Sequence, residues 1–372
     1  MPPRTLRRAV SVGLATALLT ATVASPAHAR PEDRPVTAAA TAAVFPIADD
    51  LARQLAVSLA DPATRRALVA ATATGPADLL GVRFPAAGPA GLRDANQRIL
   101  AAKGLPAATG SVLRVRLAHP DMRAALARGV APVVAATPTD DAPTTVTGYD
   151  RTGATVRFDP ARVPTRPVLL VEVDTRRALT AGLTLMRSEL ARRGITDSAT
   201  AARNAVTATA GYWATKINAV RLNDDMEPWI KGDAEIYSLV AGFGPDGKAT
   251  VDLVQMPYLN NDGTSYYPNQ LLVHFNGYKY NLADVVMMED DGDTNYQALV
   301  QAIVGALLVI VDGGVYQPLV SAILDAIPSS WYTDDPDYVD SWYTLSTASS
   351  GRLNGAAGNG WLDVSPYFVQ PL

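Results

Sequence analysis

The sequence predicts an α+β fold, with a mainly helical N-terminal region that has a small β part and a C-terminal β-sandwich-like domain that has a helical insertion. Two observations lead to this prediction. Apolar residues recur at helical spacing in much of the chain before residue 200. After it, short segments rich in β-branched and aromatic residues alternate with turn residues, which is typical of antiparallel strands.

Residues 1–29 predict a secretory signal peptide. Arg4, Arg7 and Arg8 precede an apolar stretch, and the segment ends in Ala27-His28-Ala29, which fits an A-x-A cleavage site. We therefore expect a secreted, extracellular protein that begins near Arg30. The chain has no cysteine, so disulfides and Cys-ligated zinc are excluded.

Helices and a few strands are expected in residues 30–200. Ile47, Leu51 and Leu55 are spaced for an amphipathic helix, and Asp61-Pro62 supplies an N-cap and a first helical proline for the next one. Further helices are expected over 91–104, 120–129 and 176–194, a hairpin over 144–159 and a buried strand over 166–174.

Seven strands are expected in residues 201–372, over 213–222, 235–243, 249–256, 269–276, 283–288, 340–346 and 361–369. A helical insert is expected at 295–327. Its apolar run, residues 299–311, is too short to span a membrane and ends at Asp312, so we expect no transmembrane segment after signal cleavage.

Charge divides the chain in the same place. Residues 30–223 hold 25 basic and 16 acidic residues, whereas residues 224–340 hold 3 basic and 19 acidic residues. All five tryptophans lie after residue 210. These changes predict two domains, an Ala/Arg-rich one at 30–200 and an acidic, aromatic-rich one at 201–372. The basic excess of the first domain would complement the acidic excess of the second.

The acidic residues form clusters next to predicted strands. Crowded carboxylates either become partly protonated or hold a cation, and calcium suits them because it takes six to eight oxygen ligands in flexible geometry. The sequence therefore predicts a structural calcium site with the following ligands: Asp224, Asp225, Glu227, Asp233, Glu289, Asp291 and Asp293. The alternative is a solvated acidic surface without a bound ion.

No catalytic motif identifies an enzyme. The sequence lacks HExxH, GxSxG and a phosphate-binding glycine loop. A secreted hydrolase that uses paired carboxylates, as glycosidases do, stays open as an alternative, although nothing in the sequence selects the pair. A purely structural exported protein is the other alternative.

Two classes of partner can be compared. The acidic half would repel phosphate, and the basic half has no cluster of Lys and Arg interleaved with aromatic residues, so we expect no nucleic acid. The tryptophans and the segment "SYYPNQ" contain the aromatic and amide groups of sugar-binding faces, which makes a cell-surface or extracellular glycan the candidate partner.

Three segments carry a resemblance to a known family. The segments "NDDMEPWIKGDAEIYSLV", "YYPNQLL" and "MMEDDGDTNYQALV" resemble an uncharacterised bacterial family of exported proteins, the domain of unknown function numbered 3103. The resemblance covers most of the chain after residue 29. It implies export, but no activity or fold.

Overall fold

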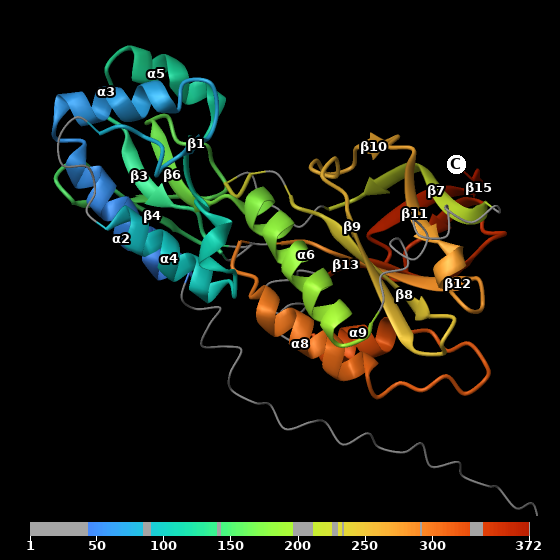
Figure 1. The fold of residues 1–372 in the computed structure, drawn as a ribbon. Helices are drawn as coiled ribbons and strands as arrows, with labels where there is room; N and C mark the ends of the chain where they lie inside the picture. The colour runs from blue at the N-terminus through green and yellow to red at the C-terminus, as the bar shows by residue number, and fades with distance from the viewer. Residues whose placement is uncertain are drawn as a thin grey trace, which may run out of the picture. The chain divides into compact units, whose positions relative to one another are not determined.

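The structure is a computed structural model that describes residues 44–84, 91–139, 143–195, 211–224, 230–232, 234–290, 292–327 and 338–371. In these residues seven α-helices accompany three sheets, which are antiparallel except at one strand pair (Figure 1). The predicted α+β class is confirmed. The predicted signal peptide lies outside the described residues.

The first sheet has the strand order β1-β2-β6-β3-β4-β5. Its strands are β1 (Ala77–Asp78), β2 (Leu113–Leu117), β3 (Val133–Ala136), β4 (Val146–Tyr149), β5 (Thr155–Phe158) and β6 (Val168–Val173). Only β3 and β6 pair in parallel. All six residues of β6 are buried, because both faces of this central strand are covered by apolar groups.

Five helices belong to the same part of the chain: α2 (Val44–Ser58), α3 (Pro62–Ala71), α4 (Leu92–Ala102), α5 (Arg123–Ala127) and α6 (Thr175–Arg192). The predicted apolar stripe of α2 is buried. The Asp61 carboxylate caps α3 by accepting hydrogen bonds from the N–H groups of Ala63 and Thr64, and Pro62 occupies the first turn, as the sequence predicts.

The second and third sheets pack face to face. One contains β7 (Tyr212–Leu222), β10 (Ser265–Tyr266), β11 (Gln270–His274), β14 (Gly351–Asn354) and β15 (Gly360–Val369). The other has the order β13-β12-β8-β9, with β8 (Tyr237–Phe243), β9 (Ala249–Gln255), β12 (Leu282–Met288) and β13 (Tyr338–Ser346). Ile217, Val220 and Leu362 from the first meet Val240 and Val285 from the second in one core cluster.

Helices cover the other face of the β13-β12-β8-β9 sheet. The helical insert contains α8 (Tyr296–Leu307) and α9 (Val320–Ala326), and α8 also packs against α6. Residues of β8 therefore alternate between two cores, with Leu239 toward the helices and Val240 toward the other sheet. This explains why β8 is buried along its whole length and reads as a continuous apolar run.

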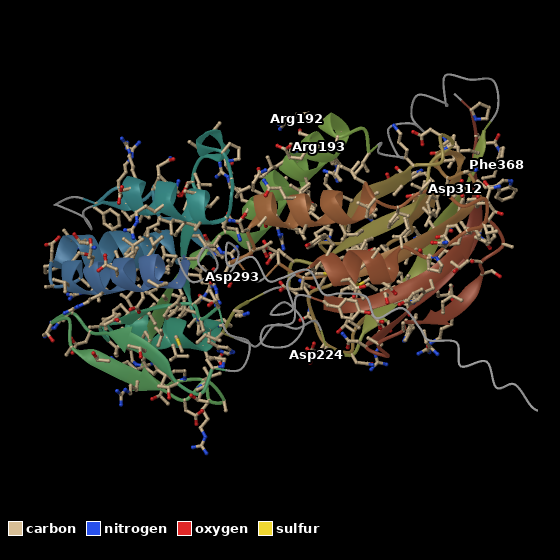
Figure 2. The ribbon with its side chains drawn as sticks, turned by 90° about the horizontal axis from the view of Figure 1, so that it is seen from below. Arg192, Arg193, Asp224, Asp293, Asp312 and Phe368 are labelled. Atoms are coloured by element: carbon tan, nitrogen blue, oxygen red, sulfur yellow. The ribbon has the colours of Figure 1, made fainter. Side chains whose placement is uncertain are left out.

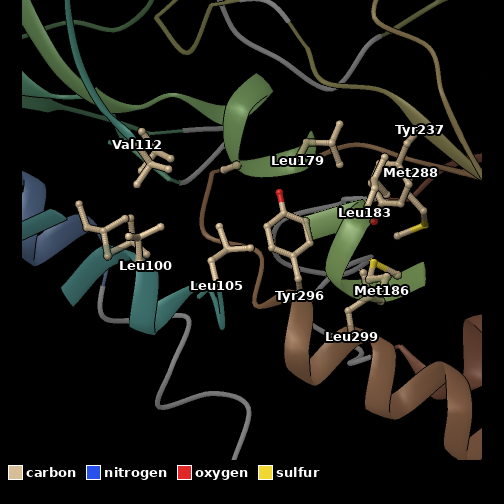
Figure 3. Close-up of a cluster of buried hydrophobic side chains, with 14 of the residues drawn as sticks. Leu100, Leu105, Val112, Leu179, Leu183, Met186, Tyr237, Met288, Tyr296 and Leu299 are labelled. Carbon is tan, nitrogen blue, oxygen red and sulfur yellow. The ribbon is translucent and has the colours of Figure 1, made fainter. Parts of the chain in front are cut away.

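One apolar cluster contains residues from both sides of position 200. Leu100 and Leu183 from the first part of the chain share it with Tyr237, Met288 and Tyr296 from the second (Figure 3). Residues 36–372 accordingly group into one compact unit. The predicted domain boundary near residue 200 marks a change of composition, and as a boundary between domains it stays a prediction.

The order of elements agrees closely with the sequence analysis. The seven strands expected after residue 200 all form. The sequence does not predict β1, β2 and β3 of the first sheet, nor the short strands β10 and β14. Among the described residues, none of the helices combines the length and the apolar character needed to cross a membrane.

Candidate functional site

The C-terminal end of acidic segment 224–235 lies beside the N-terminal end of acidic segment 289–293. The backbone N–H of Glu235 donates a hydrogen bond to Oε1 of Glu289 at 3.3 Å, across 54 residues of sequence. Both side chains are at least 95% buried. The contact arises because Glu235 leads into β8 and Glu289 follows β12, and these two strands are neighbours in one sheet.

A small cleft opens beside this junction. Its wall combines the first turn of α2, the segment after β3, the end of β6 and the two acidic segments. The polar side chains that line it are those of Arg114, Thr137, Thr139, Glu172, Thr175, Lys231 and Glu235. Gly292 also lines it, with a positive φ of 80° that suits glycine.

Two arginines hold Glu172 in the cleft. Nε of Arg114 donates to Oε1 at 2.5 Å, and Nε of Arg116 donates to Oε2 at 2.8 Å. The hydroxyl of Thr137 lies 3.1 Å from Oε2 as a further donor. Arg114 and Arg116 point the same way because they are two residues apart on strand β2. Glu172 is thus a buried carboxylate with a fixed orientation.

Glu235 is the second carboxylate of the cleft. It accepts a hydrogen bond from the hydroxyl of Thr175, and Nε of Arg176 lies 4.0 Å from its Oε1. Burial raises the pKa of Glu235 to about 7, against the opposing effects of the Thr175 hydroxyl and Arg114. A carboxyl group with this pKa is partly protonated near neutral pH, so it can act as a proton donor or acceptor there.

A buried lysine compensates the second acidic segment. Nζ of Lys103, at the end of α4, lies 3.5 Å from Oδ1 of Asp290, and both side chains are fully buried. The hydroxyl of Tyr296 donates to the other oxygen of Asp290. A basic residue 187 positions away in sequence therefore relieves part of the repulsion among these acids.

Three of the seven predicted ligands lie in the described residues (Figure 2). Glu289 and Asp293 are buried in the junction segment. Asp224 is exposed at the end of β7, where its backbone bonds to the side chain of Asn359. The other four, Asp225, Glu227, Asp233 and Asp291, lie outside the described residues, so the predicted site is neither assembled nor excluded. Within the described ranges, no group of three or more His, Asp or Glu side chains could hold a metal ion.

The charges at the junction can be compared. The described carboxylates there are those of Glu172, Asp174, Glu235, Glu289, Asp290 and Asp293, and the cations are those of Lys103, Arg114, Arg116, Arg176 and Lys231. The six negative charges and the five positive charges nearly cancel. Further negative charge in the two acidic segments comes from the exposed Asp224 and from the four acids outside the described residues.

Glu172, Arg114 and Lys103 are not among the site residues that the sequence predicts. The alternation in "LRVRL" could have identified β2 and placed both arginines on one face. For Lys103 the sequence holds no such signal, because its burial depends on α8 meeting the end of α4.

The fold and the site together define an α+β protein with buried, charge-paired carboxylates beside an open cleft. The family model described as "Protein of unknown function (DUF3103)" matches residues 47–372. The chain belongs to this family, as the resemblance of its acidic segments indicates. It matches no curated protein and no solved structure.

Proposed function

We propose that the protein is an exported calcium-binding protein in which the ion ties together the acidic segments 224–235 and 289–293. The observation that carries this proposal is the hydrogen bond between Glu235 and Glu289, which brings the two segments to one place. Export is proposed from the leader-like residues 1–29.

The charge balance supports a cation at this place. The described carboxylates of Glu172, Glu235 and Asp290 each lie beside a lysine or arginine. Asp225, Glu227, Asp233 and Asp291 add four carboxylates to the same two segments without adding a basic residue. A divalent ion with oxygen ligands would offset that excess, with Glu289 and Asp293 as the described candidates for further ligands.

Thermal unfolding in calcium and in EDTA tests the proposal. Calcium at about ten times its dissociation constant should stabilise the protein by roughly 1.4 kcal/mol and raise its melting temperature. In the double variant Asp233→Asn, Asp291→Asn this rise should largely disappear. The matched control is Asp121→Asn, whose side chain is 88% exposed outside both segments and should leave the rise unchanged. A melting temperature that does not change when calcium is added contradicts the proposal.

A second candidate function is hydrolysis by paired carboxylates, and one specific observation favours it. Glu172 and Glu235 line the same cleft, and Arg114 is close enough to interact with both. Glycosidases place two carboxyl groups across a cleft, one to protonate the leaving oxygen and one to act as nucleophile or base. Glu235 would be the proton donor, because Glu172 is held by two arginines.

A panel of fluorogenic glycosides tests this second function. Turnover should be found with the native protein and fall by at least about a hundredfold in Glu235→Gln, because general acid catalysis typically contributes that much. Glu189→Gln, near the C-terminal end of α6 and not among the residues that line the cleft, is the matched control and should keep full activity. If no glycoside is turned over, or if Glu235→Gln is as active as the control, the hydrolase function is wrong.

A further inference from the structure

We propose that the outer face of the β7–β15–β14 sheet binds an anionic polysaccharide. We call this surface the strand face, and it is defined by Lys216, Arg221, Arg352, Trp361, Asp363 and Tyr367. It goes beyond the calcium proposal, because none of its residues belongs to the acidic segments.

The strand register places these side chains on one surface. The opposite face of this sheet is the buried one, because Val220 and its partner Leu362 lie fully buried in the core between the two sheets. The next pair along, Arg221 and Trp361, therefore points outward. Val364 is likewise buried, so Ser365 faces outward beside its partner Lys216.

Two aromatic rings on this face lie beside cations. The guanidinium carbon of Arg352 is 4.2 Å from the centre of the Trp361 ring, and Nζ of Lys216 is 5.7 Å from the centre of the Tyr367 ring. The two rings are six residues apart on one strand, which corresponds to roughly 20 Å. Several sugar rings in line would span that distance, with one stacking surface near each end.

Hydroxyl-binding groups lie between the two rings. Nδ2 of Asn218 donates to Oδ1 of Asp363 at 3.1 Å, and the hydroxyl of Ser365 donates to Oδ1 of Asn218 at 3.1 Å. All three side chains are partly exposed. Acceptors and donors fixed in this way can bond to sugar hydroxyls without first having to be ordered.

The charge of the face argues for an anionic ligand. Residues 211–371 contain only six basic residues against twenty acidic ones, yet three of the six lie on this one face, where they outnumber its single carboxylate. No described residue accepts a hydrogen bond from the buried Nε of Arg221. A uronic acid polymer supplies carboxylates for these cations, which guanidinium groups bind in a bidentate manner.

Nucleic acid is disfavoured as the occupant, although its bases also stack on aromatic rings. Its phosphates would meet Asp363 in the middle of the face, where a single-stranded nucleic acid offers few hydroxyl groups. A polysaccharide offers neutral hydroxyls at the same positions.

Hydrogen bonds from β13 of the neighbouring sheet fix the strands of the strand face. The carboxylate of Asp340 on β13 accepts hydrogen bonds from the N–H groups of Ala357 and Gly360, in the turn that joins β14 to β15. The indole of Trp342 donates to the carbonyl oxygen of Leu353 on β14. The strands that carry Arg352 and Trp361 are thus fixed to the sheet beneath them.

The test measures binding to polygalacturonate, alginate and hyaluronate, with methyl-esterified polygalacturonate as the uncharged counterpart. All measurements are made in EDTA with the full-length mature protein, so that a failure of the calcium proposal cannot produce or mask the result. We expect at least one uronate polymer to bind, the esterified form to bind at least about tenfold more weakly, and affinity to fall as salt rises.

Variants locate the binding on the strand face. The double variant Lys216→Gln, Arg352→Gln should weaken binding by at least about tenfold, and Trp361→Ala by a similar factor. Because Trp361 is partly buried, the double variant decides the outcome if Trp361→Ala fails to fold. Lys248→Gln is the matched control, because this lysine is 70% exposed in the turn between β8 and β9, away from the strand face, and its loss should leave affinity unchanged.

Four outcomes would overturn the inference. They are binding to none of the three polymers, equal binding to the esterified polymer, unchanged affinity in the double variant, and tighter binding to single-stranded oligothymidylate than to any uronate polymer.

Discussion

Asp312 shows how one residue holds an exposed apolar segment in place. Val309, Val311 and Val315 follow α8 and are more than 70% exposed. Asp312 lies within this segment. Its carboxylate accepts hydrogen bonds from the ammonium of Lys279, from the hydroxyl of Tyr280 at 2.7 Å and from the N–H of Gly314 at 2.9 Å. These donors, Lys279 foremost, lower the pKa of Asp312 to about 2.

The lowered pKa predicts a dependence of stability on pH. A carboxyl group whose pKa is lower in the folded state stabilises the fold above its unfolded pKa of about 3.9, and this contribution is lost as the pH falls toward about 2. The substitution Lys279→Gln should therefore raise the pKa of Asp312. Between pH 4 and pH 2, the free energy of unfolding of the variant should fall less than that of the native protein. Carboxyl NMR titration and urea unfolding at several pH values measure both effects. An unchanged pKa of Asp312 in the variant would contradict this account.

At the scale of the elements, the packing of α6 on α8 depends on a glycine. A Cβ atom on Gly182 would lie 2.3 Å from Cδ1 of Tyr296, so the helices can approach only because residue 182 has no side chain. The fully buried ring of Tyr296 fills this space (Figure 3). Its hydroxyl donates a hydrogen bond to Asp290. Burial, followed by the charge of Asp290, raises the pKa of Tyr296 well above its usual value.

Gly182→Ala should therefore destabilise the protein by about 1–3 kcal/mol, the usual effect of overpacking a core. Gly305→Ala provides the control within α8, because a Cβ there meets nothing within 4 Å. Alanine is the better helix former, so this second change should stabilise the protein by up to about 1 kcal/mol. Urea unfolding of the two variants measures the difference. If both changes had the same sign, the close packing at Gly182 would not be the cause.

At the scale of the whole molecule, the first and second parts of the chain share a buried polar contact. Lys103 ends α4, Asp290 follows β12, and neither side chain is exposed. The chain around them is tied together as well, since the N–H of Tyr296 donates to the carbonyl of Lys103 and the side-chain amide of Asn295 to the carbonyl of Ala102. The basic excess of the first part thus meets the acidic excess of the second at a specific buried pair.

Removing one partner should be more harmful than removing both charges. Lys103→Met should destabilise the protein by about 3–5 kcal/mol, because it leaves the carboxylate of Asp290 buried without its cation. Adding Asp290→Asn should recover a substantial part of that loss, since Tyr296 can still bond to the amide. A double-mutant cycle by urea unfolding gives the coupling energy. Additive effects of the two changes would show that the pair is not coupled.

The sequence by itself determined the fold class and most of the elements. Residues that alternate or recur at a fixed spacing act through local geometry, so the strands after residue 200 and the cap at Asp61 could be predicted from neighbours in the chain. His119 acts in the same local way, because its Nδ1 accepts the N–H of Asp121 at the start of a short 3-10 turn. The meeting of the acidic segments at Glu235 and Glu289 does not follow from local geometry, because it depends on the pairing of β8 with β12.

Only the tertiary structure decided how the acidic residues are compensated. Lys103, Arg114 and Arg116 lie far from Asp290 and Glu172 in sequence. The chain brings them together through the pairing of β2 with β6 and through the hydrogen bonds between the end of α4 and the start of α8. The sequence can count charges, but their interaction energy depends on distance and burial. Those two quantities are fixed only when distant elements share one core.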